Sequence, residues 1–157
     1  MNNFVVPANA YESHNAYRRL QMNLSLNDPK TAVIEIRTFL KIYPDVAQAC
    51  NDLGVLYYRE GEKLLALACY EKANRLQPGT PDIVKNLADF YCIELGWTDD
   101  AIRMLTELLC AHPEDRDLVI KLALLNEKAG RHQEACSFYS EALELNPSDY
   151  AVREALE

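Results

Sequence analysis

The chain contains 157 residues, of which 49% are hydrophobic, and it carries a net charge of −8 at pH 7. This composition supports a packed core and excludes a chain that is disordered throughout. No stretch approaches the roughly 20 apolar residues that a membrane-spanning helix needs, and the start lacks the basic-then-apolar layout of a secretory signal. We therefore expect a cytoplasmic protein with no membrane insertion.

The charge is divided unevenly between the two halves of the chain. Residues 1–80 contain 9 Lys and Arg against 8 Asp and Glu, whereas residues 81–157 contain 7 against 16, so the net charges are +1 and −9. An acidic surface repels phosphate backbones and attracts basic segments of a protein partner, chiefly by raising the association rate. We expect no nucleic-acid partner, and charge alone leaves open whether the acidic half binds a partner or only maintains solubility.

The first predicted helix pair covers residues 13–46, after an expected N-terminal tail of residues 1–12. A turn at Asn27-Asp28-Pro29 separates its two helices, and Ala32, Ile36 and Phe39 mark the apolar face of the second helix. In the first helix, Arg19-Leu20 stand where the second pair has Leu-Gly. We expect this helix to be irregular or to act as an N-terminal cap.

The second predicted pair, residues 47–80, has a glycine inside its first helix. Gly54 costs about 1 kcal/mol relative to alanine in a helix. In the second helix Ala66 and Ala73 flank Tyr70, so the tyrosine ring can enter a gap in the neighbouring helix. We expect Gly54 to let the helices of this pair approach closely, and the resulting packing to offset the propensity cost.

The third and fourth predicted pairs cover residues 81–115 and 116–149. The third has one extra residue in the segment "IELGWTDD" between its helices, where the only tryptophan, Trp97, lies. Trp97 suits either an anchor for a partner or a shield over the turn, and we favour the shield. Residues 150–157 begin like another first helix, which predicts a truncated helix or a cap.

Three residue types keep one period along the chain. The prolines, alanines and glycines that mark each pair recur at spacings of 34 or 35 residues, and they are Pro44, Pro78, Pro113 and Pro147; Ala32, Ala66, Ala101 and Ala135; and Gly61, Gly96 and Gly130. Such a period predicts stacked units of two helices, each stabilised by contacts with its neighbours.

The units resemble tetratricopeptide repeats (TPR). The second unit matches the family pattern at Leu53, Gly54, Tyr57, Ala66, Tyr70, Ala73 and Pro78, with Cys50 in place of the early tryptophan. The resemblance implies an all-α fold, namely a right-handed α-solenoid of antiparallel helix pairs with about four units. It also implies that the first helices line a concave groove and that the second helices form the convex side.

The sequence lacks the motifs of catalysis and of cofactor binding. Its three histidines are isolated, and HExxH, GxSxG, GxGxxG and the phosphate-binding GxxxxGK[ST] are all absent. The five cysteines are separated by 18 to 26 residues and fall in apolar helical patterns, so we expect buried, reduced thiols. We therefore expect no enzyme, no cofactor and no metal.

The resemblance places the binding surface on the first helices, at positions opposite the packed Leu-Tyr stripe. The predicted groove residues are Tyr17, Gln21, Gln48, Asn51, Val55, Tyr58, Asp82, Lys85, Asp89, Asp117, Ile120, Leu124 and Glu127. The clamp by which some family members hold the terminal carboxylate of a heat-shock chaperone is not assembled, because only Asn51 and Lys85 match it. Amide and aromatic groups suit recognition of a peptide backbone, and Ile120 and Leu124 suit an apolar side chain of a partner.

The predicted function is a non-catalytic scaffold for protein–protein interaction, which binds a peptide or helix of a partner in the groove. One alternative is the regulatory or substrate-docking region of a larger enzyme, for which bacterial TPR proteins fused to glycosyltransferase or methyltransferase domains give a precedent by resemblance. Another is a self-assembling module, a homo-oligomer that forms through the ends of the repeat array.

Overall fold

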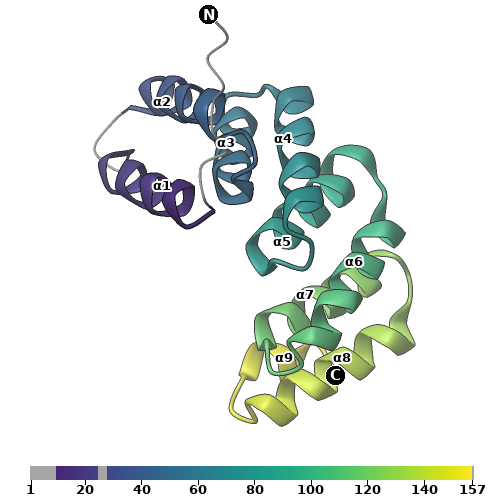
Figure 1. The fold of residues 1–157 in the computed structure, drawn as a ribbon. Helices are drawn as coiled ribbons and strands as arrows, with labels where there is room; N and C mark the ends of the chain where they lie inside the picture. The colour runs from purple at the N-terminus through teal and green to yellow at the C-terminus, as the bar shows by residue number, and fades with distance from the viewer. Residues whose placement is uncertain (1–9, 25–27, 157) are drawn as a thin grey trace, which may run out of the picture. The chain divides into compact units, whose positions relative to one another are not determined.

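The computed structural model describes residues 10–24 and 28–156, and within these ranges it contains helices and no strand (Figure 1). The helices are α1 (Ala10–Leu24), α2 (Pro29–Ile42), α3 (Ala47–Arg59), α4 (Lys63–Leu76), α5 (Pro81–Phe90), the π-helix η1 (Tyr91–Leu95), α6 (Thr98–Ala111), α7 (Arg116–Lys128), α8 (His132–Leu145) and α9 (Tyr150–Glu154). The predicted all-α fold class is confirmed. The chain divides into two compact units, unit 1 (Met1–Asn86) and unit 2 (Leu87–Glu157).

The two ends of the described chain differ from the expectation in detail. Helix α1 begins at Ala10, inside the predicted tail, and runs as a continuous α-helix through Arg19 and Leu20. The expectation of an irregular first helix is therefore wrong. Asn27 of the predicted first turn lies outside the described residues. At the other end, α9 is a short helix that buries Val152.

Aspartates stand at the start of several helices and fix where those helices begin. The Asp28 carboxylate accepts the backbone N–H groups of Lys30 at 2.9 Å and Thr31 at 3.2 Å, and Pro29 occupies the first helical position of α2. Asp115 likewise accepts the Leu118 N–H at 3.0 Å at the start of α7. A carboxylate at this position satisfies amide donors that have no partner inside the helix.

The expected close approach at Gly54 is present between α3 and α4 of unit 1. A Cβ atom added to Gly54 would lie 2.8 Å from two ring carbons of Tyr70 and 3.3 Å from the carbonyl oxygen of Ala66. The Tyr70 ring, only 4% exposed, therefore occupies the space that any larger side chain would need. Packing against this ring explains why the helix keeps a glycine in its interior.

Glycines in the left-handed conformation terminate three of the first helices. Gly61, Gly96 and Gly130 have φ angles of +83°, +68° and +74°. This conformation is costly for residues with a Cβ atom, so glycine is the residue best suited to it. The 34- or 35-residue spacing of these glycines thus reflects one turn geometry used three times.

The extra residue of the third predicted pair is absorbed by the π-helix η1. In the preceding pair the amide that follows the turn glycine, Glu62 N–H, donates to Tyr57 O at 2.9 Å and spans five residues. In η1 the equivalent bond runs from Trp97 N–H to Tyr91 O, also at 2.9 Å, and spans six residues. A π-helical turn holds one more residue than an α-helical turn, so the insertion widens the end of the helix and leaves the glycine turn intact.

Trp97 packs beside this turn. Its ring lies edge-on to Tyr91 with 5.3 Å between ring centroids, and the side chain is 51% exposed. The contact with Tyr91 is the one that a shield over the turn would make.

The core of unit 1 includes a cluster to which three helices and the start of α5 contribute. These residues are small or medium-sized, which allows the helices to pack closely. The cluster consists of Ala47, Cys50, Ala73 and Ile83, with Leu40 and Leu76 packed against it.

All five cysteines are free thiols, but they do not share one environment. Cys50 and Cys92 are buried, whereas Cys110 and Cys136 are exposed on α6 and α8. Burial raises the pKa of the half-buried Cys69 thiol to about 11. The expectation that every cysteine is buried is wrong for Cys110 and Cys136, because each follows an inward position by one residue and one residue turns a helix by about 100°.

Candidate functional site

Three polar residues occupy equivalent positions on consecutive first helices. Each forms a hydrogen bond with the first helix of the preceding helix pair. Asp52, Asn86 and Lys121 are separated by 34 and 35 residues. In unit 1, Asp52 accepts bonds from α1, and Asn86 Nδ2 donates to Asn51 Oδ1 at 3.0 Å. In unit 2, Lys121 Nζ donates to Asp89 Oδ2 at 2.6 Å. We call these contacts the polar ladder, and they fix the register between neighbouring first helices.

The strongest convergence of polar groups surrounds the Asp52 carboxylate. Its Oδ2 accepts bonds from Tyr17 Oη at 2.7 Å and Gln21 Nε2 at 2.9 Å, both from α1. Its Oδ1 accepts bonds from Gln48 Nε2 at 2.8 Å and Asn51 Nδ2 at 3.5 Å, both from α3. We call these five residues the Asp52 network. All four donors are neutral groups, so the negative charge of Asp52 is stabilised by dipoles alone within the network.

Two members of the Asp52 network lie inside the protein. Tyr17 and Asn51 are each only 2% exposed. Burial, followed by the nearby Asp52 charge, raises the pKa of Tyr17 above its usual range, so the phenol keeps its proton and donates a hydrogen bond to Asp52. The sequence placed both residues on a surface open to a partner, whereas the structure buries both in the polar ladder.

The other predicted groove residues of unit 1 lie nearer the surface. Gln48 and Val55 share one side of α3 with Asp52, as expected for residues three or four apart. The remaining predicted residues comprise Gln21, Gln48, Val55 and Lys85, which are half-buried, and Tyr58 and Asp82, which are exposed. The structure therefore brings Gln21, Gln48 and Val55 together around Asp52.

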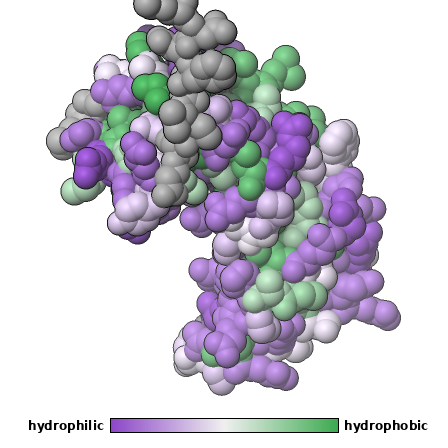
Figure 2. All heavy atoms as spheres, viewed as in Figure 1, coloured by the Kyte–Doolittle hydropathy of each residue, from purple (hydrophilic) through white to green (hydrophobic). Residues whose placement is uncertain are grey.

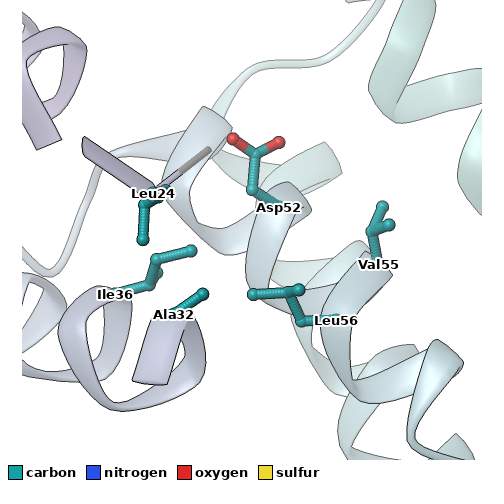
Figure 3. A pocket seen from close by; sticks show the side chains of 6 residues that line it. All are labelled: Leu24, Ala32, Ile36, Asp52, Val55 and Leu56. Atoms are coloured by element: carbon teal, nitrogen blue, oxygen red, sulfur yellow. The ribbon is translucent and has the colours of Figure 1, made fainter. Parts of the chain in front are cut away.

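A pocket of about 290 Å³ lies beside the Asp52 network in unit 1 (Figure 3). It is lined by Leu24 of α1, Ala32 and Ile36 of α2, and Asp52, Val55 and Leu56 of α3. In Figure 3 the side chains of Leu24, Ile36 and Leu56 face a common space, and Asp52 lies beside it with its carboxylate directed away from these three side chains. Among the described residues the lining is therefore apolar apart from one carboxylate, and we call this cavity the Asp52 pocket.

In unit 2 the predicted groove residues divide between internal contacts and exposure. Asp89 is engaged by Lys121, and Ile120 is half-buried. Leu124 is 54% exposed, and Asp117 is exposed as well. Leu124 and Asp117 are therefore accessible to solvent, and their contact with a partner stays a prediction.

Glu127 makes a contact within its own helix pair. Its Oε2 accepts a bond from Tyr139 Oη on α8 at 2.8 Å. Burial, then the bond to Glu127, raises the pKa of Tyr139 to about 12. The Glu127 carboxylate is therefore exposed to solvent and also bonded to α8.

Apolar side chains are also exposed on the second helices. Ile34 on α2 is 64% exposed, and Leu64 on α4 is 85% exposed. On the face shown in Figure 2, apolar residues appear as several small areas between hydrophilic ones. Single exposed apolar residues are common on protein surfaces, so these positions serve as controls for first-helix residues.

Residues 10–24 and 28–156 contain no group of three or more His, Cys, Asp or Glu side chains that could hold a metal ion. Among the helices of these residues, none combines the length and the apolar character that crossing a bilayer needs.

The sequence-based prediction omitted the residues that organise the polar ladder. Asp52, Asn86 and Lys121 each follow a predicted groove residue by one position. The helical spacing used to select groove residues therefore did not include them. The signal that could have found them is their own spacing of 34 and 35 residues, with a hydrogen-bonding side chain each time.

Two models of the tetratricopeptide repeat match this chain, one over residues 47–80 and one over residues 93–150. The chain belongs to the tetratricopeptide repeat family. The predicted α-solenoid class is confirmed by the same matches together with the TPR structures described below.

Two curated relatives are longer proteins. This TPR chain is 27% identical over 135 residues to the Anaphase-promoting complex subunit 7 of Arabidopsis thaliana, covering 85% of this chain and 24% of that protein. It is 26% identical over 125 residues to the Cytochrome c-type biogenesis protein CycH of Rhizobium meliloti (strain 1021), covering 78% of this chain and 33% of that protein. The chain thus spans about a quarter and a third of these two relatives.

Solved TPR structures share the fold. A tetratricopeptide repeat protein from Parabacteroides merdae superposes with a TM-score of 0.78 at 21% identity, covering 90% of this chain and 56% of that one. YrrB, described as a TPR protein with an unusual peptide-binding site, superposes with a TM-score of 0.73 at 18% identity, covering 87% and 70%. At these identities the likeness concerns the fold alone.

Proposed function

We propose that this chain is a non-catalytic scaffold that binds a peptide segment of a partner protein on the first-helix face of unit 1. This face is defined by Gln21, Gln48, Asp52, Val55 and Tyr58. The observation that carries the proposal is the Asp52 network beside the Asp52 pocket, since fixed polar groups border an apolar cavity. Side chains that are ordered before the partner arrives lose little conformational entropy on binding.

The chemistry of this face suits an extended peptide. A glutamine amide has two N–H groups and one carbonyl oxygen, and Gln21 and Gln48 each donate one N–H to Asp52. Each amide therefore keeps capacity for a peptide backbone group, while the Asp52 pocket and Tyr58 offer apolar contacts to side chains. Backbone bonds combined with side-chain pockets are a common mode of peptide recognition.

The comparisons support a role in protein interaction. One relative is named as a subunit of a complex, and one solved structure of the same fold is named for its peptide-binding site. Both names describe those proteins, and the proposal for this chain rests on its own Asp52 network and pocket.

The proposal is tested by selecting linear peptides from a random library against the immobilised full chain. The site of binding is then mapped by NMR on isotope-labelled protein. We expect the largest shifts at Gln48, Val55 and Tyr58, and we expect Tyr58→Ser to weaken binding several-fold by removing an exposed aromatic contact. The matched control is Leu64→Ser on α4, which removes a more exposed apolar side chain from a second helix.

Two results would contradict the proposal. One is that no selected peptide binds the chain in solution. The other is that shifts gather around Ile34 and Leu64 and that Leu64→Ser, rather than Tyr58→Ser, weakens binding. Sedimentation of the chain alone at several concentrations separates partner binding from self-association, because only self-association raises the mass with concentration.

A further inference from the structure

We infer that the Asp52 pocket receives one long basic side chain, lysine or arginine, from the bound partner. The aliphatic stem would lie among the apolar lining, and the charged head would reach the Asp52 carboxylate. This inference rests on the proposed function of unit 1 and adds to it the chemical class of the residue that is recognised. Three observations lead to it.

The first observation is the charge state of the Asp52 surroundings. Tyr17, Gln21, Gln48 and Asn51 supply dipoles but no positive charge. Neutral donors hold a carboxylate in place without neutralising it, so its field still attracts a cation. A hydrogen bond between charged groups is shorter and stronger than one between neutral groups.

The second observation is the remaining capacity of the carboxylate. Oδ2 accepts two bonds of normal length, whereas Oδ1 accepts one at 2.8 Å from Gln48 and one at 3.5 Å from Asn51. The second Oδ1 contact is at the outer limit of hydrogen bonding and adds little. Oδ1 is thus the oxygen that can accept a further donor without displacing a short bond.

The third observation is the lining of the pocket. Leu24, Ile36 and Leu56 face one space, and Asp52 lies beside it with its carboxylate directed outward (Figure 3). Lysine and arginine combine a three- or four-carbon stem with a charged head, and they commonly bury the stem along apolar surface. A purely apolar side chain would bring no positive charge to the carboxylate, and a short polar one would leave the apolar lining uncovered.

The attraction has to be local, because the surrounding unit has little net charge. Residues 1–80 carry a net charge of +1. General attraction to an acidic surface is therefore weak in this part of the chain, and Asp52 itself has to provide the specificity. Asp82 on α5 belongs to the same unit and is exposed, so it offers a control with the same change of charge.

The test uses acetylated and amidated pentapeptides, which carry no charge at their ends. Three peptides have the sequence Ala-Ala-X-Ala-Ala, in which X is lysine, arginine or norleucine. Norleucine keeps the four-carbon stem of lysine and lacks its charge. We expect methyl shifts of Leu24, Ile36 and Leu56 in the full chain with each basic peptide, and binding at least about tenfold weaker for norleucine.

Variants of the full chain assign the effect to Asp52. We expect Asp52→Asn to reduce affinity for the basic peptides to that of norleucine, and Asp82→Asn to leave it unchanged. Val55→Lys is a second variant that leaves the network intact. It places an internal cation three residues from Asp52 on the same helix face, so we expect it to block the basic peptides as well.

Equal binding of the lysine and norleucine peptides would overturn the inference, and so would equal losses from Asp52→Asn and Asp82→Asn. These outcomes leave the proposed function intact if library-selected peptides still bind the first-helix face. If those peptides bind elsewhere or not at all, the proposed function itself fails.

Discussion

Replacing Gly54 by alanine should destabilise the protein, although alanine is the better helix former. The added Cβ atom would lie 2.8 Å from Cδ1 and Cε1 of Tyr70, whereas non-bonded carbons prefer about 3.5–4.0 Å. The Tyr70 ring is only 4% exposed, so it cannot swing into solvent to make room. Overpacking costs about 1–3 kcal/mol, and the gain in helix propensity is about 1 kcal/mol. We expect a net loss of up to about 2 kcal/mol, and a larger loss for Gly54→Leu.

The assay is urea unfolding followed by circular dichroism, with the midpoint and the slope compared between variants. Ala68 is exposed on α4, so Ala68→Gly measures the propensity cost in this chain without a packing change. We expect this control to cost about 1 kcal/mol. An unchanged slope shows that the variant and the parent expose the same surface on unfolding.

A double variant isolates the contact with Tyr70. In a Tyr70→Ala background the ring carbons are absent, so Gly54→Ala should become stabilising by about 1 kcal/mol. The sign of the Gly54→Ala effect therefore depends on Tyr70. If Gly54→Ala stabilises the parent as much as it stabilises the Tyr70→Ala protein, the steric argument is refuted.

Three further predictions test other features of the fold. Deleting Ile93 restores the shorter spacing and should convert the π-helix to an α-helical turn with little change in Tm; a large loss in thermal unfolding would contradict this. Burial, then the bond to Glu127, raises the pKa of Tyr139 from 10.0 to about 12 in the folded state, so the protonated phenol contributes its full stability below about pH 10 and loses it towards pH 12. Tyr139→Phe should therefore flatten the fall in urea midpoint over this range, and an unchanged fall would count against it. Cys110 and Cys136 should form the fast phase of labelling by an aromatic disulfide reagent, with the other three thiols slow; three fast thiols would be inconsistent with the observed burial.

Much of the helical fold follows from local sequence signals. Turn glycines, helix-starting aspartates and small-to-large alternation are read from neighbouring residues, so the helix pairs around Gly61 and Gly130 were predictable. The π-helix was not predictable from the same signals. An extra residue can enter a turn or widen a helix end, and the backbone hydrogen bond from Trp97 to Tyr91 decides between them.

The candidate site was predicted less completely. Helical periodicity selected Tyr17, Gln21, Gln48 and Asn51, and these four side chains do lie close together. It did not select Asp52, the carboxylate to which all four donate. Periodicity gives the side of a helix on which a residue lies, but it does not state which side chains from the next helix face it.

The sequence by itself determined that this chain is a helical repeat protein, because its prolines, alanines and glycines recur with a period of 34 or 35 residues. Only the tertiary structure decided which polar residues are buried against one another and which stay accessible to solvent. The spacing within each helix places Tyr17 and Asn51 among the groove residues, yet both are buried. Asp52 of α3 lies beside Tyr17, and Asn86 of α5 lies beside Asn51. The physical reason is that a hydrogen bond between two helices depends on their relative register. That register is set by the packing of one helix pair on the next, and the sequence pattern of a single helix does not contain it.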